Sequence, residues 1–405
     1  MEIVREDYLE KVNASLGKGL IIVLVGQRRV GKSCLLHLLK AQKEADPDGN
    51  VIYIDKEKRE FDSIQTYEDL NSYIGQHWNR SAHNYILIDE VQDIAGFERS
   101  LRSYRTEADT DIIVTGSNAK ILSTELSTLI GGRYKEIHVL PLSYKEFLNF
   151  HHLQDSDDTL GLYLNLGGMP GLQRIGLDEA EVREYQSGIY HTALLKDVVM
   201  RNEIRNPVFL ENLLRFVGDN IGKLISANSL SKYMKGQGEK IAPAGIINYL
   251  RYLAEAYVIK KVNRYDIHGK RLLETNEKYY FEDNGIRNAI VGGNREGDIE
   301  KVIENVVYLQ LIRMGYDVCV GQLQAGEVDF VCTRHDGQRL YVQASYLIID
   351  PETREREFGN LASIKDNYPK YVISMTPLVG KSDYEGITHL HLRRFLQNGF
   401  EDAVL

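Results

Sequence analysis

The sequence predicts an α/β protein whose N-terminal part is a parallel β-sheet covered by helices on both faces. Within residues 1–150, apolar runs rich in β-branched residues alternate with runs of helical periodicity, and this alternation is typical of parallel sheets. The first apolar run, residues 19–25, leads directly into a loop with two glycines and then into a helical run. With 405 residues the chain is too long for one ordinary core, so we expect further domains.

The expected elements of residues 1–150 follow in chain order. Strands are expected where short apolar runs end at polar or turn residues, at 19–25, 50–55, 84–89, 111–115 and 135–140. Helices are expected at the intervening runs, 34–39, 66–78 and 97–108. The residues Pro141-Leu142-Ser143 then begin a helix over 144–150, which closes the first domain.

Three further segments complete the expected organisation. Residues 151–220 have a helical pattern interrupted at Gly167-Gly168-Met169-Pro170-Gly171. Residues 221–290 are expected to form a short helix, a turn, a second helix and two strands (226–235, 236–238, 243–254, 257–266 and 272–281), which is the order of a winged helix. Residues 291–405 are expected to form a last α/β unit with a helix at 299–314 and strands near 316–320, 327–332 and 340–345.

Residues 26–33 match the phosphate-binding pattern G-x-x-x-x-G-K-[ST] at every position. Gly26 and Gly31 let the backbone wrap around a phosphate chain, Lys32 would reach the β- and γ-phosphates, and Ser33 would hold Mg²⁺. Further nucleotide contacts are expected from three neighbours in the loop and the first turn of the helix, namely Arg29, Val30 and Cys34. The strand before the loop and the helix after it favour this interpretation over a chance glycine-rich turn.

Two carboxylates stand at the end of the strand expected at 84–89. Asp89 can hold the Mg²⁺ water shell, and Glu90 can orient or deprotonate an attacking water. An ordinary strand followed by an acidic turn is the alternative interpretation, which the preceding phosphate loop makes less favoured. The sequence therefore predicts ATP and Mg²⁺ as cofactors.

Polar residues also follow the next two strands. Ser117 or Asn118 can contact the γ-phosphate or the attacking water, or can cap the following helix, and both roles are compatible. Arg133 precedes the strand at 135–140 and can neutralise charge in the transition state, commonly on the nucleotide of a neighbouring subunit. An ordinary surface or ion-paired arginine is the alternative.

These motifs together resemble the prokaryotic AAA+ ATPases, and more narrowly the group related to archaeal and STAND-type ATPases. The resemblance rests on the phosphate loop, Asp89-Glu90-Val91-Gln92, residues 115–118, and Gly132-Arg133 ahead of Pro141-Leu142-Ser143. It implies ATP hydrolysis, a helical lid over 151–220, and a homo-oligomer such as a hexameric ring with Arg133 as candidate arginine finger. Gly168-Met169-Pro170 resembles the lid motif of that group, which carries Pro170 over as a contact near the adenine.

The middle segment has its own charge balance. Between Lys223 and Arg271 ten residues are basic and three are acidic, in a chain of net charge −9. A basic winged helix is the electrostatic signature of a DNA-backbone contact, with packing against other domains as the alternative. The candidate contacts on the second helix and the hairpin are Lys240, Asn248, Arg251, Lys260, Lys261 and Arg264.

The C-terminal segment resembles restriction-endonuclease-like folds. Such nucleases place a Glu on a helix, an Asp on a strand, and an acidic or Gln residue followed two positions later by Lys on the next strand. Glu304 and Asp329 match this order, but the run Gln343-Ala344-Ser345 departs from it, because Ser345 stands where the Lys would be. Glu304, Glu327 and Asp329 can still bind a metal or take part in hydrogen bonding. We therefore expect a retained fold with a degenerate site that does not cleave DNA.

Composition sets further limits. No apolar run approaches the roughly 20 residues that span a bilayer, and the charged N-terminus has no apolar signal core. The three cysteines form no CxxC pair and fit reduced thiols. We therefore expect a cytoplasmic protein without a membrane partner. Its function is expected to be ATP hydrolysis coupled to binding or remodelling of branched or single-stranded DNA; a STAND-type nucleotide switch that regulates protein assembly is the alternative.

Overall fold

The computed structural model describes residues 4–119, 131–204, 206–236, 238, 241–293, 297–324, 326–377 and 382–401. Contacts divide the chain into two compact units. The first contains Met1–Pro141 with Glu255–Tyr257, and the second contains Leu142–Ala254 with Val258–Leu405. No helix in the described part of the chain combines the length and the apolar character needed to cross a bilayer.

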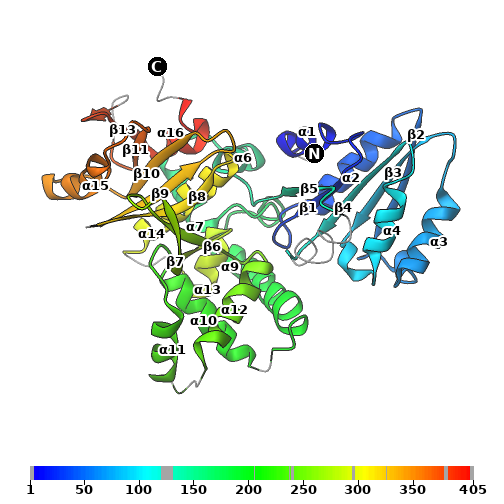
Figure 1. Ribbon diagram of the computed structural model, residues 1–405, viewed down its shortest axis with the longest axis horizontal. Helices are drawn as coiled ribbons and strands as arrows, with labels where there is room; N and C mark the ends of the chain where they lie inside the picture. The colour runs from blue at the N-terminus through cyan, green and yellow to red at the C-terminus, as the bar shows by residue number, and fades with distance from the viewer. Residues whose placement is uncertain are drawn as a thin grey trace. The chain divides into compact units, whose positions relative to one another are not determined.

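The first unit contains the predicted parallel sheet (Figure 1, blue to cyan). Its five strands lie in the order β2-β3-β4-β1-β5, and every neighbouring pair is parallel. Because all the strands run the same way, their carboxyl ends meet at one edge, where polar loops can gather. The strands are β1 (Ile21–Val25), β2 (Gly49–Asp55), β3 (His83–Asp89), β4 (Thr110–Gly116) and β5 (Tyr134–His138).

The helices of the first unit cover a sheet whose central strands are buried on both faces. β1 is buried at all five positions, as expected for a central parallel strand. Alternate residues such as Ile21, Val23 and Val25 join the core formed with α3 (Tyr67–His77) and α4 (Phe97–Tyr104). The remaining helices are α1 (Glu6–Asn13) and α2 (Lys32–Glu44), with single 3₁₀ turns at Arg59–Phe61 and Val91–Asp93.

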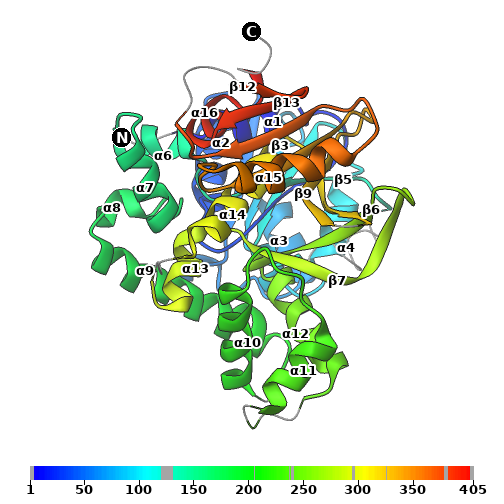
Figure 2. The same cartoon turned by 90° about the vertical axis from the view of Figure 1, so that its left-hand side faces the viewer.

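The second unit is built around a mixed eight-stranded sheet in the order β12-β13-β11-β10-β9-β8-β6-β7. Figure 2 shows its hairpin of β6 and β7, in yellow-green, continuing beside the C-terminal strands. The strands are β6 (Ile259–Asp266), β7 (Arg271–Phe281), β8 (Asp317–Leu323), β9 (Gly326–Thr333), β10 (Arg339–Ser345), β11 (Lys370–Ser374), β12 (Ser382–Tyr384) and β13 (Ile387–His391).

The hairpin of β6 and β7 connects the two segments that were expected at 221–290 and 291–405. The strands expected at 257–266 and 272–281 both form, as β6 and β7. β6 also pairs in parallel with β8, so that Arg264–Asp266 lies beside Val320–Gln322. The two ranges therefore contribute strands to one sheet. Ahead of the hairpin, α11 (Ala227–Gly236) and α12 (Pro243–Glu255) form the expected pair of helices.

Helices occupy the rest of the second unit. Residues 144–219 contain α6 (Tyr144–His151), α7 (Asp157–Leu166), α8 (Leu172–Ile175), α9 (Glu179–Thr192), a π-helical turn (Ala193–Met200) and α10 (Pro207–Asp219). The C-terminal part contains α13 (Asn284–Val291), α14 (Ile299–Arg313), α15 (Pro351–Ser363) and α16 (Leu392–Asn398).

The glycines at 167 and 168 have a packing role in this unit. A Cβ on Gly167 would lie 2.3 Å from Asp283 Oδ1, and one on Gly168 would lie 2.3 Å from the Leu142 carbonyl oxygen. Asp283 is buried, caps α13 and accepts the Gly168 N–H at 2.7 Å. Burial raises the pKa of Asp283 to about 6, although several backbone N–H groups stabilise its charged form.

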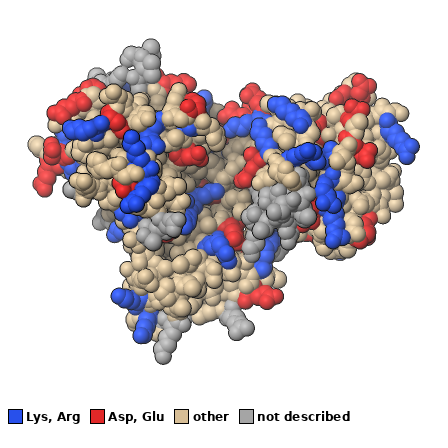
Figure 3. All heavy atoms as spheres, viewed as in Figure 1, with Lys and Arg blue, Asp and Glu red and all other residues tan. Residues whose placement is uncertain are grey.

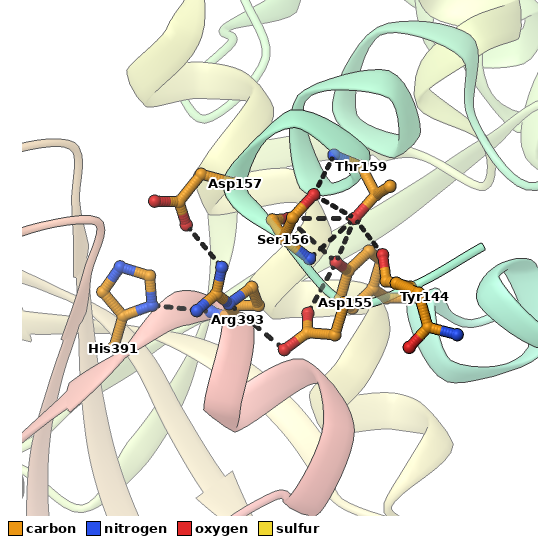
Figure 4. A network of polar contacts seen from close by, with 8 residues as sticks. Tyr144, Asp155, Ser156, Asp157, Thr159, His391 and Arg393 are labelled. Atoms are coloured by element: carbon orange, nitrogen blue, oxygen red, sulfur yellow. Dashed lines mark hydrogen bonds and ion pairs between the residues drawn. The ribbon is translucent and has the colours of Figure 1, made fainter.

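Ion pairs connect the last helix with the acidic run at 155–158 (Figure 4). Arg393, at the start of α16, lies 3.3 Å from Asp155 Oδ2 and 2.8 Å from Asp157 Oδ1. Tyr144 donates a hydrogen bond to Asp155 at 2.8 Å, and Ser156 caps α7. The acidic run therefore joins helices α6, α7 and α16 through this network.

Candidate functional site

Residues 26–31 form a tight loop between β1 and the first turn of α2. Gly26 has φ 144°, and a Cβ there would lie 2.3 Å from the Val139 carbonyl oxygen. Gly31 caps α2 with φ 98°, while Arg29 adopts a left-handed φ of 65° without being glycine. This backbone presents the N-terminus of α2 to the interior of the loop, as a phosphate site requires.

Lys32 points into the loop that precedes it. Its side chain is buried, and Nζ donates hydrogen bonds of 2.9 Å to the carbonyl oxygens of Gly26 and Gln27. The loop is also braced by Arg5, which donates to the carbonyl oxygens of Val30 at 3.1 Å and Leu140 at 2.8 Å. A lysine ammonium thus already lies inside the loop, where its charge would meet phosphate oxygens.

The predicted Mg²⁺ ligands lie next to each other. The Ser33 hydroxyl is hydrogen-bonded to the Asp89 carboxylate, as is that of Thr115. Burial, with smaller contributions from Glu90 and Asp55, raises the pKa of Asp89 despite these hydrogen bonds. A neutral hydroxyl oxygen and a negatively charged carboxylate oxygen are both ligands that suit Mg²⁺. Ser33 and Asp89 therefore fit the implied cation.

Asp55 is a site residue that the sequence analysis did not single out. It ends β2 directly opposite Asp89 at the end of β3, and it is buried. Its carboxylate accepts the Glu57 N–H at 3.0 Å and the Tyr53 hydroxyl at 3.3 Å. The signal was present in the sequence, because an apolar strand ending in Asp occurs at both 50–55 and 84–89.

Glu90 is held by residues of two strand ends. It has left-handed backbone angles (φ 52°, ψ 52°) and its N–H donates to Thr115 Oγ1 at 2.9 Å. Its Oε2 accepts the Ser117 hydroxyl at 3.1 Å and also the side-chain amide of Gln92. Asn118 follows Ser117 and is buried, as are Ser117 and Glu90. The candidate base and the polar β4 exit therefore form one hydrogen-bonded group.

Arg133 lies at the opposite edge of the sheet from the phosphate loop. Its carbonyl accepts the Ile21 N–H at 3.1 Å, at the amino end of β1, whereas the loop follows Val25 at the carboxyl end. Five strand residues span about 16 Å, too far for one side chain to bridge. Arg133 is exposed, so any contact it makes with phosphate would involve the nucleotide of another chain. Cys34 is also exposed, and Pro170 belongs to the second unit.

The candidate DNA contacts are largely engaged within the hairpin and sheet. Lys260 lies 3.2 Å from Glu282, Lys261 lies 2.6 Å from Glu277, and Arg264 donates to Gln322. Asn248 and Arg251 are exposed on α12, and Lys240 lies outside the described residues. On the face shown in Figure 3, both basic and acidic side chains lie on the surface of the described residues.

The acidic residues of the C-terminal segment surround a lysine that the sequence analysis did not single out. Lys278 Nζ, from β7, lies 3.0 Å from Glu304, 2.5 Å from Glu327 and 3.8 Å from Asp329. These carboxylates raise the pKa of Lys278, although its burial acts in the opposite direction. Lys278 is not recognisable from the sequence around Gln343, because β7 precedes that strand by some 60 residues.

The same cluster contains the other predicted residues. Asp329 Oδ2 accepts the Ala344 N–H at 2.9 Å, and Gln343 donates to Glu357 at 3.1 Å. Burial and the charge of Glu304 raise the pKa of Asp329 well above its usual range. Among the described residues, no group of three His, Cys, Asp or Glu side chains has an arrangement that could hold a metal ion.

The first unit thus has the fold of a P-loop ATPase domain of the AAA class. Residues 18–148 match the family model described as an AAA domain, and residues 157–297 match that of a domain of unknown function. The chain belongs to the same family as a Haemophilus influenzae protein described as uncharacterised, with 34% identity over 379 residues, which are 92% of this chain and 93% of that protein.

Two more distant similarities agree with this assignment. A Methanocaldococcus jannaschii protein, also described as uncharacterised, is 26% identical over 310 residues, or 73% of this chain and 67% of that protein. The structure of a Walker-type ATPase of Pyrococcus abyssi matches with a TM-score of 0.51 and 19% identity, covering 71% of this chain and 96% of that one. At this identity the match is a likeness of fold.

Proposed function

We propose that the protein hydrolyses ATP in a Mg²⁺-dependent reaction at the carboxyl edge of the first sheet. The observation that carries the proposal is the meeting of three groups at this edge: Lys32 inside the loop, Ser33 bonded to Asp89, and Glu90 anchored beside them. This is the set of groups that phosphoryl transfer to water requires.

Each residue has a defined task in this proposal. The loop N–H groups and Lys32 bind the β- and γ-phosphates, and Ser33 and Asp89 hold Mg²⁺, which supplies charge neutralisation when bound. Glu90 accepts a proton from water as the water oxygen bonds to the γ-phosphorus and the bond to the β-phosphate oxygen breaks. We also propose that Arg133 acts between subunits of a homo-oligomer, since it lies at the far edge from its own loop.

Replacing Lys32 with alanine tests nucleotide binding. We expect affinity for ATP to fall about tenfold or more, because a charge-assisted contact to phosphate worth about 1.5–3 kcal/mol is lost. Titration with a fluorescent ATP analogue measures the affinity, and Lys40→Ala on the same helix is the matched control. Unchanged affinity in Lys32→Ala would argue against the assigned loop.

We further propose that ATP hydrolysis is coupled to a DNA-backbone contact of α11 and α12. Support comes from the exposed positions of Lys232 and Lys235 on α11 and of Asn248 and Arg251 on α12. The hairpin lysines contribute less in this proposal, because Glu282 and Glu277 already compensate their charges.

Charge reversal at Lys232 and Lys235 tests the DNA contact. We expect the double Glu variant to reduce the slope of log affinity against log salt concentration by about two, roughly one for each lost phosphate contact. Fluorescence anisotropy with duplex, single-stranded and four-way DNA measures it, with Lys261→Gln as the ion-paired control. If the slope and affinity do not change, DNA is not bound by these helices.

A nucleotide switch that regulates protein assembly is the second candidate. The packed segment Gly167-Gly168-Met169-Pro170 favours it, because a lid motif fixed by Asp283 and Leu142 suits a stable nucleotide-bound state. Steady-state ATPase activity with and without DNA, measured beside the native mass, separates the two. DNA-stimulated turnover in a large oligomer supports the first, and slow turnover indifferent to DNA in a monomer or dimer supports the switch.

A further inference from the structure

The peptide group between Val30 and Gly31 lies where the phosphate loop passes into helix α2. Gly31 is the N-terminal cap residue of α2, and a cap N–H has no acceptor within its own helix. Glycine populates positive and negative φ about equally, so the backbone of Gly31, with φ 98°, does not by itself decide which way this peptide group faces. Hydrogen bonds to the Val30 carbonyl oxygen must decide it.

Arg5 holds the carbonyl side of this peptide group. Its Nη1 donates hydrogen bonds to the carbonyl oxygens of Val30 at 3.1 Å and Leu140 at 2.8 Å, and its Nη2 donates to that of Pro141 at 3.4 Å. The Val30–Gly31 peptide bond is trans, and in a planar trans peptide group the C=O and N–H bonds point in opposite directions. The Gly31 N–H therefore points away from the Arg5 guanidinium.

The Arg5 side chain is itself fixed in place. It is buried, with 6% of its surface exposed, and its guanidinium carbon lies 4.4 Å from the centre of the Tyr8 ring. The Tyr8 hydroxyl accepts the Leu140 N–H at 3.1 Å, so helix α1 and residues 140–141 hold the guanidinium together. Hydrogen bonds from a charged donor are about twice as strong as neutral ones, which suits Arg5 to fix the direction of a loop peptide.

The direction of this peptide group matters to a bound nucleotide because its two ends have opposite polarity. An N–H donates to phosphate oxygens, whereas a carbonyl oxygen in the same place would repel them. We propose that Arg5 is a positioning residue for nucleotide binding: it holds the Val30 carbonyl and thereby keeps the Gly31 N–H directed at the phosphate chain. This inference rests on the proposed binding of ATP in the loop. Arg5 lies outside the pattern at 26–33, so the pattern does not reveal it.

Arg5→Met tests this role, because methionine fills part of the space and donates no hydrogen bond. We expect the affinities for a non-hydrolysable ATP analogue and for ADP to fall to the same extent, by about tenfold, the scale of one weakened charge-assisted hydrogen bond. The losses should be equal because the backbone N–H groups of such a loop contact the α- and β-phosphates, which both nucleotides carry. Calorimetry measures both affinities, at a temperature where circular dichroism shows each variant to be folded.

Tyr8→Phe is the matched control. It removes the acceptor of the Leu140 N–H, so it loosens the segment that holds Arg5 without removing a hydrogen bond from the loop. Its thermal midpoint should fall, as that of Arg5→Met should, but its nucleotide affinities should stay at the wild-type values. An equal loss of affinity in Tyr8→Phe would mean that general loosening around α1 is the cause, and it would overturn the positioning role.

Wild-type affinity in folded Arg5→Met would also overturn the inference, while leaving the proposed function intact. So would a ratio of wild-type to variant affinity that falls to one at high salt, because Arg5 would then act through its charge rather than through the loop backbone. If Arg5→Met does not fold, Arg5→Gln takes its place with the same expected loss, because its amide nitrogen stands at the position of Nε and falls short of Nη1. Absence of nucleotide binding by the wild-type protein would instead overturn the proposed function and, with it, this inference.

Discussion

Glu90→Gln is expected to lower ATP turnover at least about 100-fold, the lower bound for loss of a general base. Glutamine keeps the shape and still accepts the Ser117 hydroxyl, but it cannot take a proton from water. Binding should survive, because Lys32 and the loop are unaffected. The measurement is single-turnover hydrolysis beside calorimetric affinity for ATP.

A matched variant sharpens this result. Glu98→Gln, at the start of α4, makes the same change on a buried glutamate of the first unit outside the phosphate site. It should hydrolyse ATP at nearly the wild-type rate if it remains folded. Retained turnover in Glu90→Gln would remove Glu90 as the base and would point to the neighbouring Asp55 or Asp89 instead.

Lys278→Met is expected to destabilise the second unit by about 3–5 kcal/mol, the usual result of removing one partner of a buried ion pair. Lys278 is only 3% exposed and lies among Glu304, Glu327 and Asp329. Methionine fills the same volume but leaves these carboxylates without their ammonium. Urea unfolding monitored by circular dichroism measures the change, with Lys261→Met as control.

The control variant Lys261→Met also removes a lysine from an ion pair, but that pair is exposed to solvent. Lys261 is 48% exposed in its pair with Glu277, and such pairs contribute about 0–1 kcal/mol. Equal losses in the two variants would mean that burial does not govern the cluster.

The loss in Lys278→Met should depend on pH in a defined direction. The pKa of Asp329 is raised in the folded state by burial and by Glu304. A group with a raised folded pKa stabilises the fold in its protonated form, and that contribution is lost as the pH rises through the folded pKa. Without the ammonium, ionisation of Asp329 becomes still less favourable, so the destabilisation should be smallest in acid and grow as the pH rises. A loss independent of pH would contradict this account.

The first sheet was predictable from the sequence because its signals are local. Buried parallel strands are continuous apolar runs, and the phosphate loop is one contiguous segment. The comparisons confirm the α/β class and the AAA domain over residues 18–148. Helix 97–108 was expected to be longer than α4, which ends at Tyr104, because its last apolar position is not followed by a clear stop signal.

The residues missed by sequence reasoning are those that depend on contacts between distant strands. Asp55 meets Asp89 only through the register of β2 with β3, and Lys278 meets Asp329 only once β7 and β9 lie in one folded unit. Neither contact has a fixed spacing in the sequence. Gln92 was visible in the motif Asp89-Glu90-Val91-Gln92, but its amide contact requires the 3₁₀ turn to be known.

The parallel pairing of β6 with β8 governs how this chain can be divided for experiment. A truncation after residue 290 removes β8 and leaves the paired edge of β6, Arg264–Asp266, without its neighbour. Unpaired strand edges promote association between molecules, and Lys278 would also lose Glu304, Glu327 and Asp329. A fragment that keeps these contacts therefore has to extend beyond Asp329, and a shorter helix-hairpin fragment invites aggregation.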